Sequence, residues 1–329
     1  MYGDFSRLTV ANARHRHYAS VLLQQGRVHL DADWNELVAL TAAHTEARMT
    51  DIIGRTGAPK RDAGFRVVRR GSSFTISAGR YYVDGVMVEN DARVSYEEQA
   101  EGVVQPEITT LLADGETGVV YLDVWKEDVC ALEDIRLREP ALGGPDTATR
   151  LKIAWHVGVQ VLGDTGLSID AITHRARLGT PVWLPGSGAM RAGTRVPDHL
   201  PDDSDCMLAP EAGYLSQDNR VYRVEIHRGG ARNQARFKWS RENGSVLALL
   251  ERNADGEFLL GGAMEDEALG FPDDVKVEVF DDSDRHLGRA GLLRRMRCQP
   301  DGTVVFTGGL GRSFDDMSNP RVRRWDQGA

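Results

Sequence analysis

The chain has 329 residues, which at roughly 100 to 200 residues per domain predicts about two domains and excludes one small disulfide-stapled module. Hydrophobic residues make up 41% and charged residues 27%, as in ordinary globular proteins, so wholesale disorder is excluded. The net charge is -9 and the pI is near 5.5, so no overall positive field exists to attract nucleic acid.

The cell compartment and the redox chemistry follow from what the sequence lacks. No apolar run approaches the ~18 residues that span a bilayer, and residues 1–5 do not resemble a signal peptide. We therefore expect no membrane insertion, with synthesis and assembly in the cytoplasm. The three cysteines have no Cys-x-x-Cys spacing, which excludes a disulfide framework and a thiolate zinc site, and we expect no cofactor.

Residues 1–57 are predicted to form an N-terminal arm and one helix that act as an assembly or docking segment. The helix is predicted over about residues 34–53, where apolar side chains recur at helical spacing, and Asp33 and Glu36 have the spacing of a capping box. Such a stripe needs a partner to bury it. The candidate interface residues are Trp34, Leu37, Val38, Thr41, Met49 and Ile52.

Beyond residue 57 the hydrophobic period becomes two, which predicts short β-strands. Two hairpin-rich β domains, built as sandwiches or barrels, are expected over residues 58–185 and 206–329. The Gly-, Pro- and Asp-rich stretch 186–205 is expected to be a linker or a long loop. Asp-Gly dipeptides begin at residues 84, 114, 255 and 301, and some of them should close hairpins.

The clearest hairpin signal is Asn243-Gly244, which lies between two runs with strand periodicity. A two-residue turn here would set Trp239 opposite Ala248 and Phe237 opposite Leu250. The sequence therefore predicts that the aromatic face of residues 236–242 points into a core.

Two motifs resemble ligand-binding loops without matching them. Asp31, Asp33 and Asn35 have the spacing of the first oxygen ligands of a calcium loop, but Glu36 and Ala42 replace the required glycine and glutamate, so helix capping explains the acidic residues better. The loop at residues 142–150 has the composition of an anion cradle but lacks phosphate-loop spacing. It is predicted to be a structural turn built on Gly143, Gly144, Pro145 and Arg150.

No motif predicts catalysis. Acidic runs at residues 202–205 and 281–284 and the pair His15 and His17 are interpreted as solvated surface groups rather than metal ligands. There is no Gly-x-Ser-x-Gly elbow, and carboxylate pairs such as Glu133-Asp134 occur on the surface of any acidic protein. Lys238 and Trp239 alternate on a predicted strand, which fits a half-buried sheet better than a nucleic-acid platform.

Several segments resemble a family of bacterial proteins that carry a domain of unknown function and are encoded with extracellular, phage-tail-like contractile injection systems. The matching segments are GDFSR at 3–7, LQQGRVHLDADWNE at 23–36, GRYYVDG at 79–85, YLDVW at 121–125, ALGGPDTATR at 141–150, NRVYRVEIH at 219–227 and FKWSREN at 237–243. The resemblance implies a structural or accessory part of the particle and carries no catalytic residue over to this chain.

The function expected from the sequence is a structural, non-enzymatic subunit of such a particle, at its baseplate or a surrounding cage. Expected partners are other proteins of the injection system and further copies of the chain, with a homotrimer favoured by the symmetry of tail appendages. The protein would then leave the cell only as part of the particle. Two alternatives stay open: a module that binds a cell-surface glycan or receptor, and an enzymatic cargo such as a hydrolase.

Overall fold

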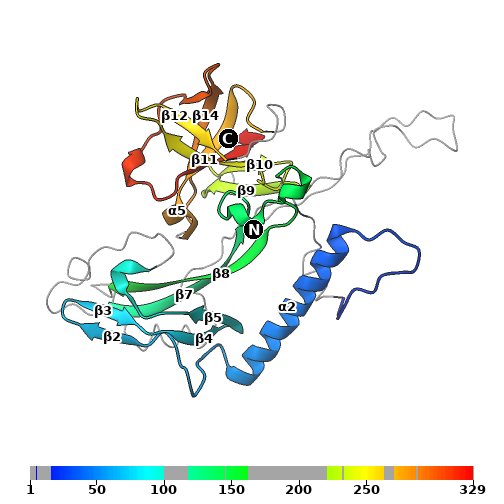
Figure 1. The fold of residues 1–329 in the computed structure, drawn as a ribbon, viewed down its shortest axis with the longest axis vertical. Coiled ribbons are helices and arrows are strands. Elements are labelled where there is room, and N and C mark those ends of the chain that lie inside the picture. The colour runs from blue at the N-terminus through cyan, green and yellow to red at the C-terminus, as the bar shows by residue number, and fades with distance from the viewer. Residues whose placement is uncertain are drawn as a thin grey trace.

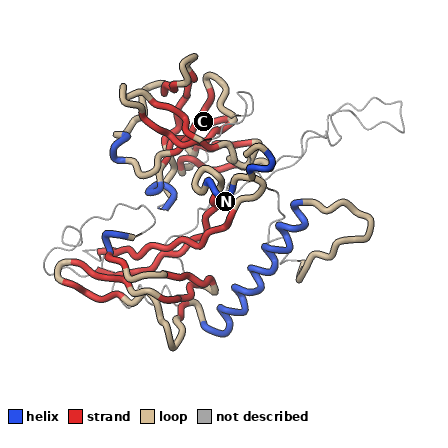
Figure 2. The backbone as a smooth tube through the Cα atoms, in the orientation of Figure 1, coloured by secondary structure: helices blue, strands red, loops and turns tan. Residues whose placement is uncertain are grey.

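A computed structural model describes residue 5 and residues 16–99, 118–144, 146–161, 221–231, 233–262, 270–286 and 288–328. Strands dominate this part of the chain, and one long helix stands beside them (Figures 1 and 2). The predicted mainly β fold, with an N-terminal helix and hairpin-rich β units, is confirmed. The predicted linker at 186–205 lies outside the described residues.

The helix α2 runs over Asp31–Ile53 and so begins three residues before the predicted start. The predicted capping box is wrong, because the residue at the N-cap is Leu30 and no side chain caps the helix. Asp31 and Asp33 instead lie inside the first turn, where carboxylates favour the positive end of the helix dipole. Gly54 follows the last turn with a φ of 92°, as the predicted stop requires.

The strands after α2 form three small antiparallel sheets. Their orders are β1-β4-β5, β2-β3-β6 and β7-β8. The bounds are β1 Thr56–Gly57, β2 Val67–Arg70, β3 Ser73–Ile76, β4 Gly79–Val83, β5 Val86–Asn90, β6 Val94–Ser95, β7 Gly118–Val129 and β8 Arg150–Val161, with 3-10 turns η1 Tyr96–Glu98, η2 Ile135–Leu137 and η3 Pro140–Leu142.

These three sheets share one core. Alternate residues of β8 enter it, so that Trp155 and Val157 pack with Ile76 and Val88. The ring of Phe65 meets Trp155 edge to face, with centroids 4.9 Å apart. The long β7–β8 ribbon therefore covers the smaller sheets on one of its faces and leaves its other face for a second contact.

Asp-Gly turns close hairpins at three of the four predicted positions, and the fourth lies outside the described residues. At Asp84-Gly85, Val83 pairs with Val86, and both turn residues have the positive φ angles (47° and 81°) of a two-residue turn. The turns at 255–256 and 301–302 join β11 to β12 and β14 to β15. These dipeptides therefore act as predicted.

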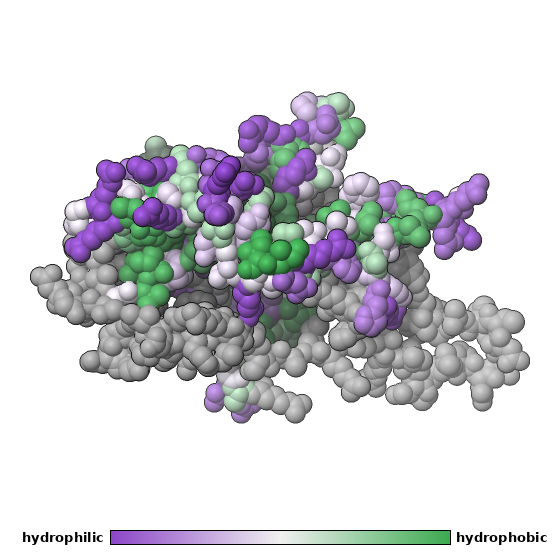
Figure 3. All heavy atoms as spheres, turned by 90° about the horizontal axis from the view of Figure 1, so that it is seen from below, coloured by the Kyte–Doolittle hydropathy of each residue, from purple (hydrophilic) through white to green (hydrophobic). Residues whose placement is uncertain are grey.

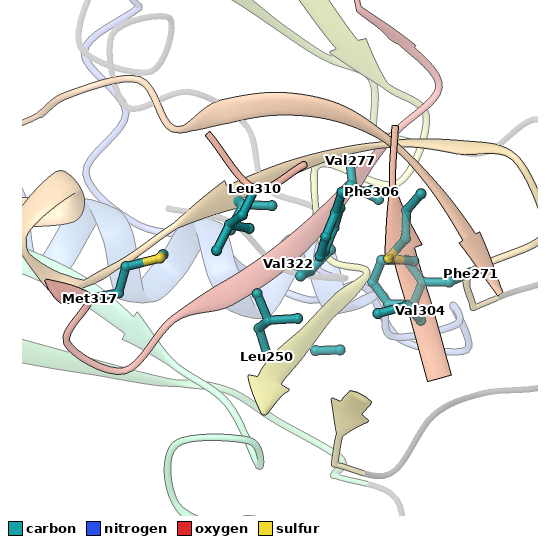
Figure 4. Packing of buried hydrophobic residues seen from close by; sticks show 11 residues of the cluster. Leu250, Phe271, Val277, Val304, Phe306, Leu310, Met317 and Val322 are labelled. Carbon is teal, nitrogen blue, oxygen red and sulfur yellow. The ribbon is translucent and has the colours of Figure 1, made fainter. Parts of the chain in front are cut away.

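The C-terminal part of the chain forms a closed six-stranded barrel of order β11-β12-β15-β14-β13-β16. Its interior is apolar and includes Leu250, Val277, Phe306 and Val322 (Figure 4). The elements are β11 Leu247–Arg252, β12 Phe258–Gly261, β13 Val275–Phe280, α5 Asp282–His286, β14 Leu292–Cys298, β15 Thr303–Phe306, η5 Phe314–Asp316 and β16 Arg321–Trp325. Closure pairs every barrel strand on both edges and removes exposed barrel edges.

A fourth small sheet, of order β17-β10-β9, lies against the barrel, and its pairing shows that the predicted hairpin is wrong. Its strands are β9 Arg223–Arg228, β10 Arg236–Ser240 and β17 Gln327–Gly328. Asn243-Gly244 does form a tight turn, with Ser245 N donating to Glu242 O at 2.9 Å. However, β10 pairs with β9 and β17, whereas β11 pairs with β12 and β16, so the strands on either side of the turn separate.

The predicted face of β10 is also wrong. Lys238 and Ser240 are buried, whereas Phe237 is exposed and Trp239 is half-buried. Val224 on β9 pairs with Trp239 and Ile226 pairs with Phe237, so the apolar side chains gather on the outer face of this sheet. The inner face, which carries Lys238, meets the wall of the barrel.

Candidate functional site

The six residues predicted as an assembly interface fall within about 120° of arc on α2 at 100° per residue. Trp34, Val38 and Ile52 are 59%, 53% and 76% exposed. Thr41 is also exposed, and Leu37 and Met49 are half-buried at the two borders of the arc. The stripe therefore faces solvent along the length of the helix, and we call these six residues the α2 stripe.

A different side of α2 holds it to the body of the protein. Leu40 is the buried residue of the helix, and Glu46 forms an ion pair with Lys126 of β7. The β4–β5 turn packs closely against α2, since a Cβ added to Gly85 would lie 2.0 Å from the carbonyl oxygen of Glu46. These contacts fix the orientation of the helix, which stands at the edge of the molecule (Figure 1).

The loop between β7 and β8 carries the predicted structural turn. Gly143 and Gly144 have φ angles of 90° and 98°, which favour glycine, whereas Pro145 lies outside the described residues. Arg150 donates to the carbonyl oxygens of Ala148 and Thr149, at 3.3 Å each. The guanidinium thus contacts the backbone of its own loop.

A charged cluster that the sequence did not predict lies between the β9–β10 sheet and the barrel. Lys238 Nζ lies 2.5 Å from Oε2 of Glu278 on β13 and 3.3 Å from Oε2 of Glu225 on β9. Nε1 of Trp325 donates to the same Glu278 oxygen at 2.9 Å, and Lys238 lies over the Trp325 ring. The pair is almost completely buried, with the Lys238 and Glu278 side chains 4% and 5% exposed.

A second charged contact joins the β7–β8 ribbon to the barrel. Glu133, in the loop after β7, forms ion pairs with Arg285 of α5 at 3.4 Å and with Arg321 of β16 at 3.5 Å. Both arginines come from the barrel, so this carboxylate ties the two parts together.

Two histidines meet beside that contact. The rings of His156 and His286 are 4.5 Å apart, and Trp125 lies 4.5 Å from His286 on another side. Burial, and then the proximity of His286, lower the pKa of His156 to about 4. Burial also lowers the pKa of His286, against the opposing effects of Asp123 and Glu127. The junction therefore holds uncharged imidazoles at neutral pH.

The remaining candidates do not converge on a chemical site in the part of the chain that the structure describes. Asp281 and Asp284 are buried, so their interpretation as solvated groups is wrong. They accept each other's backbone N–H groups, and both contact Arg312. Burial and Glu133 raise the pKa of the Cys130 thiol to about 12, which disfavours the nucleophilic thiolate. His17 is exposed, as predicted, whereas His15 and residues 202–205 lie outside the described ranges.

Within those ranges, no three side chains of His, Cys, Asp or Glu are grouped as metal ligands would be. No described helix is both long enough and apolar enough to cross a membrane.

Sequence reasoning found the α2 stripe but missed both charged contacts. Lys238 alternates with Phe237 and Trp239, and this pattern assigns the lysine to the solvent side by default. His156 lies in a continuous β8 run whose two faces are both covered, so no alternation marks it. The signal that was available is the polar His156 within the otherwise apolar run 153–159 of that strand.

Comparison with known proteins gives one match. The model of a family described only as a family of unknown function, DUF6519, matches residues 1–178 and 186–329. No curated protein and no solved structure matches the chain.

Proposed function

The chain belongs to the family of unknown function DUF6519, and from that premise we propose that it is a structural, non-enzymatic subunit of a phage-tail-like contractile injection particle. The proposed position is the baseplate or a surrounding cage, and the proposed partners are other particle proteins and further copies of the chain. The sequence segments that resemble proteins encoded with such particles support this system.

The exposed α2 stripe is the observation that carries the structural role. A helix on the surface of a globular protein normally turns its apolar stripe toward the core. In α2 the arc that contains Trp34, Val38 and Ile52 faces solvent, although Leu40 and Glu46 hold another side of the helix to the body. A fixed helix with an exposed apolar stripe is suited to receive another protein surface.

The engagement of the buried ionisable groups also favours a structural role. Lys238 pairs with both Glu225 and Glu278, and Glu133 pairs with two arginines. These groups satisfy charges at the contacts between β units, which is a structural use.

The glycan-binding alternative is less well supported. A sugar platform needs exposed aromatic rings. Among the described tryptophans, Trp34 is exposed, Trp125 and Trp239 are half-buried, and Trp155 and Trp325 are buried. The exposed Trp34 belongs to the α2 stripe, which the assembly proposal already uses, and the exposed rings of Tyr222 and Phe237 lie apart from it on the β9–β10 sheet.

The test is incorporation into particles. We expect Val38→Asp to remove the protein from purified particles, because it places a charge within the apolar α2 stripe. Ala47→Asp is the matched control, since Ala47 is also exposed but lies on another side of the helix, and it should incorporate normally. Quantitative mass spectrometry of the particles measures both. A Val38→Asp chain found at the wild-type copy number would contradict the proposal.

A further inference from the structure

The outer face of the β9–β10 sheet is a second exposed apolar surface. It consists of Tyr222, Val224, Ile226, Phe237 and Trp239. Tyr222, Ile226 and Phe237 are 59%, 54% and 50% exposed. Apolar groups are common on protein surfaces, and Figure 3 shows them dispersed among charged residues on another view of this molecule. The outer face differs because its members are cross-strand neighbours on one sheet.

The same sheet has an open edge. In the order β17-β10-β9, strand β9 pairs with β10 on one side and has no strand partner on the other within the described residues. An edge strand presents N–H and C=O groups that another extended chain can pair with. An added strand with apolar side chains at alternate positions would also extend and cover the outer face, which is the strand-addition mode of peptide recognition.

Residues 16–30 of the same chain have the chemistry of such a strand. They precede α2 and contain neither helix nor strand, and Figure 1 draws them as a loop beyond the N-terminal end of the helix. Leu22, Leu23 and Val28 are exposed, with Leu22 reaching 87%. Arg27 N donates to Gln24 O at 3.3 Å and closes a turn, so the eight residues 16–23 before it supply the strand. Extended, they span about 26 Å, which exceeds the roughly 20 Å of a six-residue strand such as β9.

We propose that the segment 16–30 of one copy of the chain adds, through residues 16–23, as a strand to the edge of β9 in a second copy and covers its outer face. Leu22 and Ile226 are exposed in the same molecule, so the segment does not occupy its own sheet here. The contact joins two different surfaces, so it is head-to-tail and closes into a ring when the rotation between copies allows. A three-membered ring would satisfy the expected trimer.

This inference rests on the proposed structural role for its biological purpose, but its test uses the purified full chain in solution and no particle. We expect light scattering to give the wild-type protein a multiple of 36.3 kDa. Ile226→Asp and Leu22→Asp should each give the single-chain mass, because each places a charge in the apolar contact. Mixed in equal amounts, they should form a complex of twice the single-chain mass, since the intact segment of the first can enter the intact sheet of the second.

Two controls separate the contact from general effects of the substitutions. Val305→Asp changes an apolar residue of β15 that is 50% exposed and lies outside the outer face, and Gln24→Asp changes an exposed polar residue of the segment. Both should assemble like the wild type. Denaturant unfolding of all the variants confirms that each is folded.

Three results would overturn the proposal. The first is a wild-type chain that stays at 36.3 kDa at every concentration. The second is a Leu22→Asp chain that assembles normally while Ile226→Asp does not, which would mean that the sheet meets another surface. The third is an equal mixture of the two variants that stays monomeric, which would exclude the head-to-tail exchange.

Discussion

Strands β10 and β11 follow one another through a tight turn, yet they bury opposite kinds of side chain. In β11, Ala248 and Leu250 point into the apolar interior of the barrel. In β10, Lys238 and Ser240 are buried, and Phe237 is exposed. Alternation along a strand determines which residues share a face, but the surface that a face meets determines which residues are stable there.

The surface that β10 meets is the outside of the barrel wall. Val277 and Val279 of β13 point into the barrel, so Glu278 between them points outward to the sheet. Glu278 accepts hydrogen bonds from Lys238, from Trp325 and, at 2.8 Å, from the backbone N–H of Gly291. A carboxylate with three donors can be buried, and it makes a lysine the best partner on the facing strand.

The largest expected loss of stability comes from removing one partner of the Lys238–Glu278 pair. Lys238→Met keeps most of the side-chain volume but leaves Glu278 buried without its cation, which should lower the free energy of unfolding by about 3 to 5 kcal/mol. Urea unfolding of the variant and the wild type measures the difference. The double substitution Lys238→Met with Glu278→Gln should recover part of the loss, because no charge is then left unpaired. A single variant as stable as the wild type would show that the pair is not buried in solution.

A smaller loss of stability should follow from creating a cavity in the barrel core. Leu250→Ala removes buried methyl groups and leaves a cavity, with an expected cost of about 3 kcal/mol. Val305→Ala is the matched control on β15, where the side chain is 50% exposed, and should change stability by only about 0.5 kcal/mol. Equal losses for the two variants would mean that burial of the side chain does not set the cost.

The strands and turns could be predicted because their signals are local. Asp84-Gly85 forms its turn, and so does Asn243-Gly244, as their left-handed φ angles show. The pairing of the following strand could not be predicted, because β11 pairs with β16, whose residues lie more than 70 positions away. Nothing in the residues beside the turn specifies that partner, and the barrel decides the pairing by closing its own edges.

The candidate functional site could likewise be predicted only where its signals are local. The α2 stripe follows from helical period alone, so Trp34 and Val38 were identified correctly as members of one face of the helix. The start of α2 was misplaced because Asp33 has a good capping side chain, yet the chain turns helical at Asp31 without one. The Lys238–Glu278 and His156–His286 contacts join distant segments, so no spacing in the sequence could indicate them.

The histidine contact should make stability depend on pH. His156 has an unfolded pKa near 6.5 and a folded pKa of about 4, so the folded state binds fewer protons between these values. Stability is therefore full above about pH 6.5 and is lost as pH falls toward 4, by about 1 to 3 kcal/mol in total. The groups that face the two rings are Asp123, Trp125 and Glu127.

Unfolding measured at about pH 7 and about pH 5 checks this expectation. His156→Gln should be less sensitive to pH than the wild type, because glutamine does not titrate. His44→Gln alters an exposed histidine of α2 and should keep the wild-type dependence. A His156→Gln variant with an unchanged pH dependence would show that other groups cause it.

The smallest effect should come from the ion pair between Lys126 and Glu46, which joins β7 to α2. The two side chains are 33% and 28% exposed, so water screens their attraction and hydrates either charge when its partner is removed. Lys126→Met should therefore cost less than about 1 kcal/mol, well below the cost of Lys238→Met. The two variants make the same chemical change, so the difference in their urea midpoints isolates burial as the cause. If Lys126→Met were as damaging as Lys238→Met, the Lys126–Glu46 pair would have to be shielded from water in solution.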